Sequence, residues 1–517
     1  MIVYSQYPSS VFSENQEFPL FTNKSETLDA LTAHLFQTGI LRIGGFDTML
    51  DLDQFRFEKD RSHQFQLLSF QWFNRIINTR GHRESQVVFG RYWEKVLYPL
   101  IVEINKSTKE PFFMAWNDHA YALRTLSLCK MFVLSEGEIR TRIRTLLIDA
   151  VAFLSNEKNY DALSNHGWDQ AKSLLIASRL INEDAKVGMQ RFRKELNQAF
   201  TVEGVHVENS PHYHIHMLNN LIHTIGLFRE IGVDETFIHE MYDIAKKSVL
   251  YYQVVLRDNG SIPLIGDSQQ TPPNLNPITK EFIVSNSKEI KNRDFFPFPE
   301  TGYCYWKYNW GEKAVHFSMK NSHFSRYHRH DDDLSITLNV DGNEVFLDGG
   351  LYKYEEKEEQ RLFFRSPYSH STIILPNCEP QRQMGYEIKN ESHDKAKIFT
   401  SNTNMWDGIR VTRCVEKRED NQFLLKDSVP INVPFFQVLF QTIAQKIEIS
   451  NKAIYLKYAD FTIFLDFAAI EGQVENIKLQ DSIYSPKYDV ISTSKTIIVT
   501  SSSQNLNYTI NLIQGKR

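Results

Sequence analysis

Apolar residues recur at three- and four-residue spacing through the first half of the chain, and this spacing predicts amphipathic helices. The pattern extends from about Leu28 to Lys280. Its clearest segments are Ala120–Phe132, Glu138–Leu154, Asp169–Ile181, Met189–Ala199, His214–Ile231 and Thr236–Leu256. Helices of this length, joined by short loops, favour a helical bundle, solenoid or toroid.

The pattern changes after Pro272, Pro273 and Pro277, and strand-like runs dominate from Tyr303 onward. The predicted strands are Ala314–Met319, Leu334–Val340, Glu344–Leu347, Ser371–Leu375, Ala453–Phe467 and Thr496–Thr500. Asp341-Gly342 lies between two of these runs and predicts the tight turn of a hairpin. We therefore expect an antiparallel β half, most simply a layered sandwich, with a domain boundary near residues 275–300.

The composition and net charge of the chain leave most functions open but argue against some binding partners. The 517 residues are enough for two or three domains, and the net charge is only −5 with acids and bases interspersed. Such a balance gives no reason to expect binding to nucleic acid or to an anionic membrane. No apolar run reaches transmembrane length, and the first residues lack the features of a secretory signal. We expect a cytoplasmic protein, or a periplasmic one if a leader has been removed.

A cluster of histidine and aspartate residues surrounds the predicted hairpin. His330, Asp348 and His370 lie on or near strand ends, so the fold can bring them together. Two imidazoles and one carboxylate form a ligand set that suits zinc. His328 lies two residues from His330 on the same predicted strand face, where it would remain free for chemistry. The run Asp331–Asp333 is interpreted as a solvated turn.

Two predicted helix starts in the first half carry further candidate residues. Asn165 and His166 precede the helix that begins near Asp169, where they could donate hydrogen bonds to a carboxylate. The alternative is that Asn165 or Ser164 simply caps the helix. Pro211 marks the start of another helix and places Tyr213 in its first turn. The helix dipole would lower the pKa of Tyr213 there and suit it to proton transfer, although a half-buried structural tyrosine is the simpler interpretation.

Taken together, these motifs resemble those of the heparinase II/III-like polysaccharide lyases, which include heparin/heparan lyases and oligoalginate lyases. The matching segments are Asn165–Trp168, Glu208–His214, Gly260–Asp267 and the series from His328 through Asp348 and Tyr352 to His370. The resemblance implies an incomplete (α/α) toroid over residues 1–285, followed by an antiparallel β-sandwich over residues 300–517. The sequence departs from the family pattern in two places. His370 is followed by Ser-Thr, where the family more often has Asn-Thr, and the acidic run Asp331–Asp333 is richer than usual.

The resemblance also implies roles for individual residues. Asn165, helped by His166, would neutralise the carboxylate of a uronic acid. Tyr213 would protonate the leaving oxygen, with a second role as base left open, and His328 would be the base or its assistant. A structural zinc ion would be held by His330, Asp348 and His370. The substrate would be an acidic poly- or oligosaccharide; the oligomeric state is left open, with a homodimer as one option.

Other polar and aromatic residues near these motifs are candidate substrate contacts. They are Trp116, His119, Arg124, Glu208, His212 and Arg365. For Trp116, His119 and the arginines, a structural ion pair or a helix cap explains the residue equally well.

Two other classes of function remain open at this point. A glycoside hydrolase on a similar helical toroid would need two carboxylates flanking the bond, with Glu208 and either Asp267 or Asp332 as the candidates. A non-catalytic glycan-binding protein could keep the fold without activity.

Overall fold

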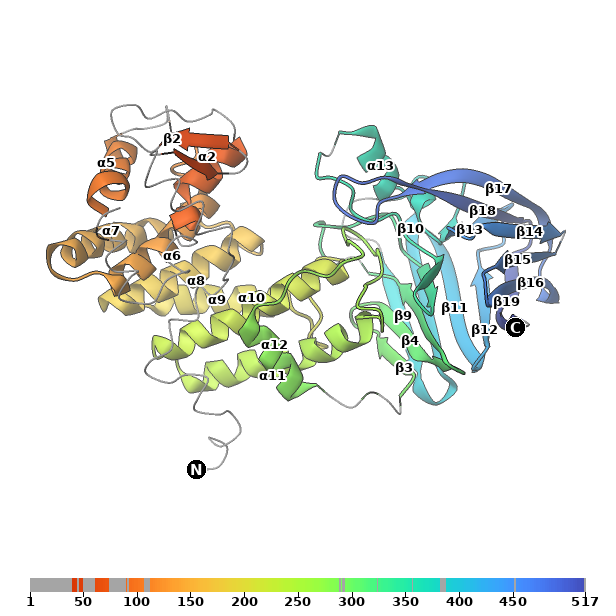
Figure 1. Ribbon diagram of the computed structural model, residues 1–517. Helices are drawn as coiled ribbons and strands as arrows, with labels where there is room; N and C mark the ends of the chain where they lie inside the picture. The colour runs from red at the N-terminus through yellow and green to blue at the C-terminus, as the bar shows by residue number, and fades with distance from the viewer. Residues whose placement is uncertain are drawn as a thin grey trace, which may run out of the picture. The chain divides into compact units, whose positions relative to one another are not determined.

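The computed structural model describes residues 40–43, 46–49, 61–73, 90, 93–106, 112–287, 290, 293–322, 324–355, 357–381, 387–450 and 452–515. The chain divides into two compact units (Figure 1). The helical unit comprises Met1–Ala199, Leu221–Tyr242 and Asn276–Glu281, and the sheet unit comprises Phe200–Asn220, Asp243–Leu275 and Phe282–Arg517. The expectations that rest on residues before 40, including the absence of a leader, lie outside the described residues.

Each predicted helical segment is a helix, with ends shifted by a few residues. The α-helices among the described residues are α2 (Arg61–Leu68), α5 (Tyr98–Lys106), α6 (Asp118–Leu134), α7 (Gly137–Ser155), α8 (Asn165–Ile181), α9 (Lys186–Ala199), α10 (Pro211–Glu230), α11 (Glu235–Val255) and α12 (Pro277–Asn286), with a short α13 (Glu359–Arg365) in the sheet unit. The prediction of continuous helical pattern from Leu28 was wrong at β1 (Ile40–Ile43) and β2 (Phe46–Met49), which pair as antiparallel strands. Two four-residue strands are too short for periodicity to distinguish from helix.

Small residues let the helices of the helical unit pack closely. Ala122 on α6, Ala150 on α7 and Leu174 on α8 belong to one buried cluster. Ser173 on α8 donates its hydroxyl hydrogen to the Ala122 carbonyl oxygen at 2.8 Å, which ties α8 to α6. The amphipathic pattern seen in the sequence therefore corresponds to packed helix faces.

The described strands of the sheet unit form antiparallel sheets of five, eight and four strands. The five-stranded sheet contains β3 (Phe295–Phe298), β4 (Tyr303–Trp310), β5 (Lys313–Lys320), β6 (Ser335–Val340) and β7 (Asn343–Phe346). The eight-stranded sheet contains β9 (Ile388–His393), β10 (Ile398–Trp406), β11 (Ile409–Glu419), β12 (Gln422–Ser428), β14 (Lys446–Ser450), β15 (Ala453–Lys457), β16 (Phe461–Glu471) and β19 (Asn505–Gln514). The four-stranded sheet contains β8 (Ile373–Ile374), β13 (Phe436–Thr442), β17 (Val474–Tyr484) and β18 (Ser492–Ser501).

The predicted hairpin is present between β6 and β7. Val340 pairs with Asn343, so Asp341 and Gly342 form a two-residue turn, and both have positive φ angles (51° and 82°). This is the backbone that an Asp-Gly turn favours. The predicted strand Ala453–Phe467 is two strands, β15 and β16, because the chain reverses between them and they pair with each other.

A second buried cluster explains why residues 200–220 belong to the sheet unit. Val205 and Ile215 pack with Tyr251 of α11 and with the strand residues Phe298 and Tyr305. The hydroxyl groups of Tyr251 and Tyr305 lie 2.9 Å apart. The first turn of α10 is thereby anchored to the five-stranded sheet. The predicted fold class, an incomplete α/α toroid followed by an antiparallel β-sandwich, is confirmed.

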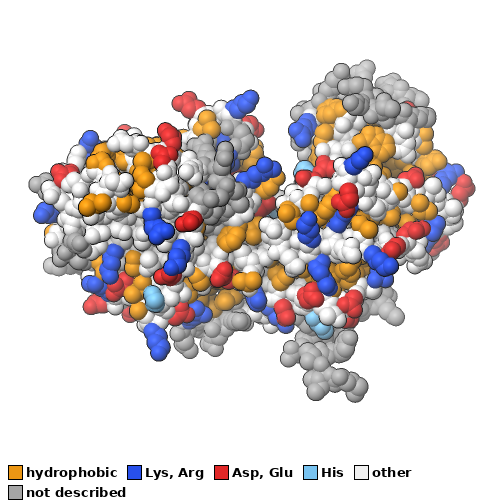
Figure 2. Space-filling view, turned by 180° about the vertical axis from the view of Figure 1, so that it is seen from behind, with side chains coloured by type: hydrophobic (Ala, Val, Ile, Leu, Met, Phe, Trp, Pro, Cys, Tyr) orange, Lys and Arg blue, Asp and Glu red, His pale blue; other side chains and the backbone are white. Residues whose placement is uncertain are grey.

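The surface agrees with the charge balance of the sequence. Figure 2 shows acidic and basic side chains interspersed over the face in view. Among the described residues, no helix combines the length and apolarity needed to cross a membrane.

Candidate active site

The start of α10 holds Tyr213 in a fixed position. Pro211 is the first residue of α10, as predicted, and the Ser210 hydroxyl accepts a hydrogen bond from the Tyr213 backbone N–H at 3.4 Å. Asn209 has a positive φ angle of 57°, and its side-chain amide donates to the carbonyl oxygens of Ser325 (2.7 Å) and Tyr327 (3.0 Å). These bonds tie the helix start to the loop that carries His328.

Tyr213 and His328 lie in direct contact. Their ring centroids are 3.4 Å apart with an interplanar angle of 16°. The prediction that His328 lies on a strand was wrong, because β6 begins at Ser335 and His328 occupies the preceding loop with a φ angle of 54°. Positive φ in a non-glycine residue is strained and often marks a functional site.

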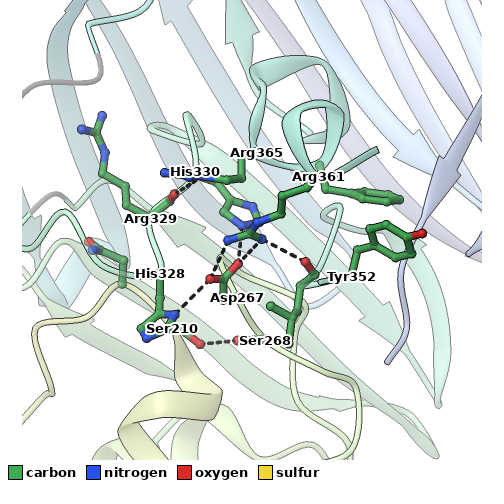
Figure 3. A network of polar contacts seen from close by, with 12 residues as sticks. Ser210, Asp267, Ser268, His328, Arg329, His330, Tyr352, Arg361 and Arg365 are labelled. Atoms are coloured by element: carbon green, nitrogen blue, oxygen red, sulfur yellow. Dashed lines mark hydrogen bonds and ion pairs between the residues drawn. The ribbon is translucent and has the colours of Figure 1, made fainter. Parts of the chain in front are cut away.

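Asp267 connects the loop that carries His328 and His330 to Arg361 (Figure 3). One carboxylate oxygen, Oδ2, is 3.0 Å from His328 Nδ1, and the other, Oδ1, is 2.8 Å from His330 Nε2. Arg361 donates to both oxygens, at 2.5 Å and 2.9 Å. The Ser268 hydroxyl lies 2.9 Å from that of Ser210, so the loop that carries Asp267 also contacts the start of α10.

Gly266 makes this close approach possible. Its φ angle is +56°, and a Cβ atom there would lie 2.4 Å from the Asn209 carbonyl oxygen and 2.8 Å from that of His328. A side chain at position 266 would therefore separate the loops that carry Asn209, Asp267 and His328.

Replacing Gly266 with alanine should destabilise the protein and lower its activity. Gly260 is the matched control, since its φ angle is +79° but an added Cβ would meet nothing within 4 Å. We expect Gly260→Ala to cost about 1–2 kcal/mol from backbone strain, and Gly266→Ala a further ~1–3 kcal/mol from overpacking. Thermal unfolding of both variants measures the difference; equal midpoints would contradict the close packing at Gly266.

Burial keeps Tyr213 protonated. Burial is the main cause that raises the pKa of Tyr213 above its usual value, and the neighbouring Tyr354 hydroxyl, 2.7 Å away, adds to the shift. The predicted lowering by the helix dipole is therefore wrong in direction, because desolvation of the phenolate outweighs it. A protonated phenol suits Tyr213 as a proton donor. Tyr354 was missed by the sequence analysis because no periodic pattern surrounds it.

The predicted metal ligands lie in the buried interior near this network. Asp348 Oδ1 is 3.0 Å from His370 Nδ1, and the His370 and His330 ring centroids are 5.3 Å apart. Asp332, Asp348 and His370 can place one ligand atom each within 4.8 Å of one another. The interpretation of Asp331–Asp333 as a solvated turn was wrong, because all three are buried and Asp332 forms an ion pair with Lys320.

The atoms left over in this cluster fit a metal ion. His330 Nδ1, His370 Nε2, Asp348 Oδ2 and Asp332 Oδ2 are buried and lack hydrogen-bond partners among the described residues. Such atoms are costly unless something binds them. Burial lowers the pKa of His330 to about 4, so its imidazole is neutral, as a metal ligand must be. Of these residues, Asp332, Asp348 and His370 place their ligand atoms within 4.8 Å of one another, and His330 lies outside that group. One nitrogen and two oxygen atoms form a donor set that zinc accepts.

Asn165 and His166 belong to the helical unit. The helix α8 begins at Asn165 rather than near Asp169, and Ser164 is the cap, accepting a hydrogen bond from the Gly167 N–H at 3.0 Å. His166 Nδ1 is 3.0 Å from Asp118 Oδ2, and this hydrogen bond raises the pKa of His166. Both Asn165 and His166 reach the surface, with Asn165 exposed.

The predicted substrate contacts of the helical unit differ in accessibility. Trp116 is exposed and stacks on Tyr121. His119 Nε2 is 3.0 Å from Asp169, and its ring stacks on that of His166. Arg124, by contrast, is buried and donates to the carbonyl oxygens of Leu68 (3.1 Å) and Ala115 (2.8 Å). Arg124 is therefore structural, but it binds main-chain carbonyl groups and does not form the ion pair or helix cap that the sequence left open.

The predicted substrate contacts of the sheet unit lie around the Tyr213–His328 pair. Glu208 Oε2 is 3.5 Å from His328 Nε2, longer than a normal hydrogen bond. Burial lowers the pKa of His212 to about 4. Arg365 is half-buried and donates through Nε to the Arg329 carbonyl oxygen at 3.3 Å.

Family descriptions match almost the whole chain. The description Heparinase II/III N-terminus matches residues 17–291, and Heparinase II/III-like, C-terminal matches residues 290–512. The chain belongs to the heparinase II/III family of proteins.

Individual relatives agree with this assignment. A heparin-sulfate lyase from Bacteroides stercoris is 21% identical over 52% of this chain and 44% of its own length. One from Bacteroides thetaiotaomicron is 21% identical over 71% of this chain and 60% of its own length. The chain thus spans about half the length of the curated relatives it matches.

Solved structures show the same fold. A heparan sulfate lyase mutant from Pedobacter heparinus matches with a TM-score of 0.74 at 15% identity, over 97% of this chain and 86% of that chain. A heparinase III gene product matches with a TM-score of 0.73 at 16% identity, over 98% and 88%.

Proposed function

We propose that this protein is a polysaccharide lyase that cleaves a uronic-acid-containing glycosaminoglycan by β-elimination. The observation that carries the proposal is the contact between a protonated tyrosine, Tyr213, and a histidine, His328, whose Nδ1 is held by Asp267. The names of the relatives support the same class of reaction.

The reaction needs one proton removed and one proton supplied. His328 Nε2 takes the proton from C5 of the uronic acid, and the electrons of the C5–H bond form the C4–C5 double bond. The C4–O bond breaks with its electron pair, and the Tyr213 hydroxyl protonates the leaving oxygen. The imidazolium of His328 then releases its proton and the Tyr213 phenolate takes one up, both by exchange with solvent, which restores the two groups. No water is consumed.

Removal of the C5 proton requires neutralisation of the adjacent carboxylate. We assign this role to Asn165 and His166, as the family resemblance implies. The raised pKa of His166 favours its imidazolium form, which can pair with a carboxylate. Hydrogen-bond donors aimed at developing negative charge are typically worth about 3–4 kcal/mol each. Trp116, His119, Glu208, His212 and Arg365 are proposed to line the substrate path.

We propose a zinc site formed by His330, Asp348 and His370, with Asp332 as an added ligand. When bound, zinc would supply fixed positive charge in the interior and hold the loop of His330 in place. His328 lies two residues from His330 on this loop, so the ligands also position the base. We propose that the boundary between the toroid and sandwich domains lies between residues 285 and 300 of the sequence.

The burial of the candidate carboxylates argues against a glycoside hydrolase. Asp267 and Asp332 are 1% and 0% exposed, and each is paired with a cation, Arg361 and Lys320 respectively. A hydrolase needs two carboxyl groups that reach the glycosidic bond. Neither aspartate can reach it.

The proposal is tested by incubating the protein with heparan sulfate, heparin, chondroitin sulfate, hyaluronan and alginate. A lyase produces a C4–C5 double bond, which absorbs ultraviolet light. We expect absorbance to rise with at least one glycosaminoglycan. Binding without any such product from the whole panel would favour the non-catalytic alternative.

A further inference from the structure

Asp267 binds several side chains of the site but is itself buried. Asp267 is 1% exposed, and it joins His328, His330 and Arg361. Figure 3 shows these side chains converging on its carboxylate, the two histidines from one loop and Arg361 from another part of the chain. Because Asp267 is enclosed, it acts through its neighbours and not on the substrate.

We propose that Asp267 is a positioning residue that fixes the tautomers of His328 and His330 in opposite senses. The inference rests on the proposed lyase function, in which His328 Nε2 accepts a proton. Asp267 and Arg361 together form the unit that holds the His328 ring with Nε2 turned away from the carboxylate.

Asp267 is bound by the guanidinium group of Arg361, which favours its charged form. Arg361 forms a two-pronged pair with both carboxylate oxygens and also donates to the Leu351 carbonyl oxygen at 2.9 Å. Such a pair is strongly charge-assisted. Asp267 is therefore an ionised acceptor.

An ionised carboxylate can only accept hydrogen bonds, and this decides where the imidazole protons lie. The neighbouring nitrogen of each neutral histidine must carry hydrogen: Nδ1 in His328 and Nε2 in His330. The lone pair is then on Nε2 in His328 and on Nδ1 in His330. In His330 this is the buried atom without a partner, next to the proposed metal ligands. The Asp267 carboxylate thus orients both His328, the proposed base, and His330, the proposed metal ligand.

The backbone reinforces this arrangement. The Asp267 N–H donates to the His328 carbonyl oxygen at 3.3 Å, so the two residues are joined by main chain as well as side chain. The His328 ring, held at Nδ1 and stacked on Tyr213, presents Nε2 on its opposite edge. Rotation of the ring would break the bond to Asp267.

The test replaces Asp267 with asparagine. The amide has one oxygen for two imidazole N–H groups, so the fixed tautomers cannot both persist. We expect kcat to fall about 10–100-fold, the usual effect of removing a group that orients a histidine, with KM little changed. The ¹⁵N NMR signals of labelled histidine, assigned with His328→Gln, should show loss of the fixed tautomer in His328 or in His330.

Matched variants separate positioning from stability. Asp427 forms a similar buried pair with Arg413 (2.8 Å and 2.8 Å) but has no hydrogen bond to any histidine of the described part of the chain. Asp427→Asn should lower the unfolding midpoint to a similar extent while kcat stays within about twofold, because surrounding structure still orients His328. The double variants Asp267→Leu/Arg361→Met and Asp427→Leu/Arg413→Met remove each pair as a unit, which limits the cost of an unpaired charge.

In Asp267→Asn the amide oxygen could still face His328 and keep its tautomer. The double variant Asp267→Leu/Arg361→Met removes both carboxylate oxygens and therefore excludes this outcome. Unchanged kcat and an unchanged Nδ1–H tautomer of His328 in that variant would overturn the inference. If the unaltered protein degrades no uronate polysaccharide, the lyase proposal fails, but the NMR comparison still shows whether Asp267 sets the tautomers.

Discussion

Replacing Tyr213 with phenylalanine should abolish most turnover while the protein still folds. The variant keeps the ring that stacks on His328 but lacks the hydroxyl that would protonate the leaving oxygen. A general acid contributes about 10²–10⁴-fold, so kcat should fall by at least about 100-fold. The rate of ultraviolet absorbance increase with the best substrate measures the loss. KM should change far less, since the aromatic surface is retained.

Tyr368→Phe is the matched control for this substitution. Tyr368 is 52% exposed and its side chain takes no part in the Asp267 network, so loss of its hydroxyl should leave kcat unchanged within about twofold. His328→Ala should lose at least as much activity as Tyr213→Phe, because it removes the base. Full activity in either Tyr213→Phe or His328→Ala would remove that residue from the mechanism.

Removal of bound metal should destabilise the sheet unit strongly. His330, Asp332, Asp348 and His370 leave buried donor atoms without partners among the described residues, and a bound ion would satisfy such atoms. At a metal concentration a thousand times the dissociation constant, binding stabilises the folded state by about 4 kcal/mol. Elemental analysis should find close to one zinc per chain, and dialysis against a chelator should lower the unfolding midpoint, with recovery on adding zinc.

Substitution of the ligands gives the control for this prediction. His370→Ala and His330→Ala should each lose the zinc. His316→Ala removes another buried histidine of the five-stranded sheet, whose Nε2 lies 2.9 Å from the Val254 carbonyl oxygen, and should retain zinc. Retention of zinc by both His330→Ala and His370→Ala would show that the ion binds elsewhere.

The elements were predictable because their signals are local. The helices α6 to α11 follow from apolar spacing, and the start of α10 follows from Ser210 and Pro211. The hairpin of β6 and β7 follows from Asp341-Gly342, which takes the positive φ angles of a two-residue turn. Each of these features depends on residues adjacent in sequence.

The chemistry of the site was less predictable because it depends on distant partners. Asp267 was first considered only as a hydrolase carboxylate, since nothing near it in sequence indicates Arg361 or the histidines it binds. The run Asp331–Asp333 has the composition of an exposed turn, but Lys320 lies beside it and compensates its burial. The pKa of Tyr213 depends on its depth in the fold, which outweighs the helix dipole.

The most direct test of the proposed function is the mass of the product formed in ¹⁸O-labelled water. β-Elimination uses no water, so the new non-reducing end should be unsaturated, carry no label, and be lighter by one water molecule than the product of hydrolysis. A saturated new non-reducing end, together with ¹⁸O at the new reducing end, would contradict the roles given to Tyr213 and His328.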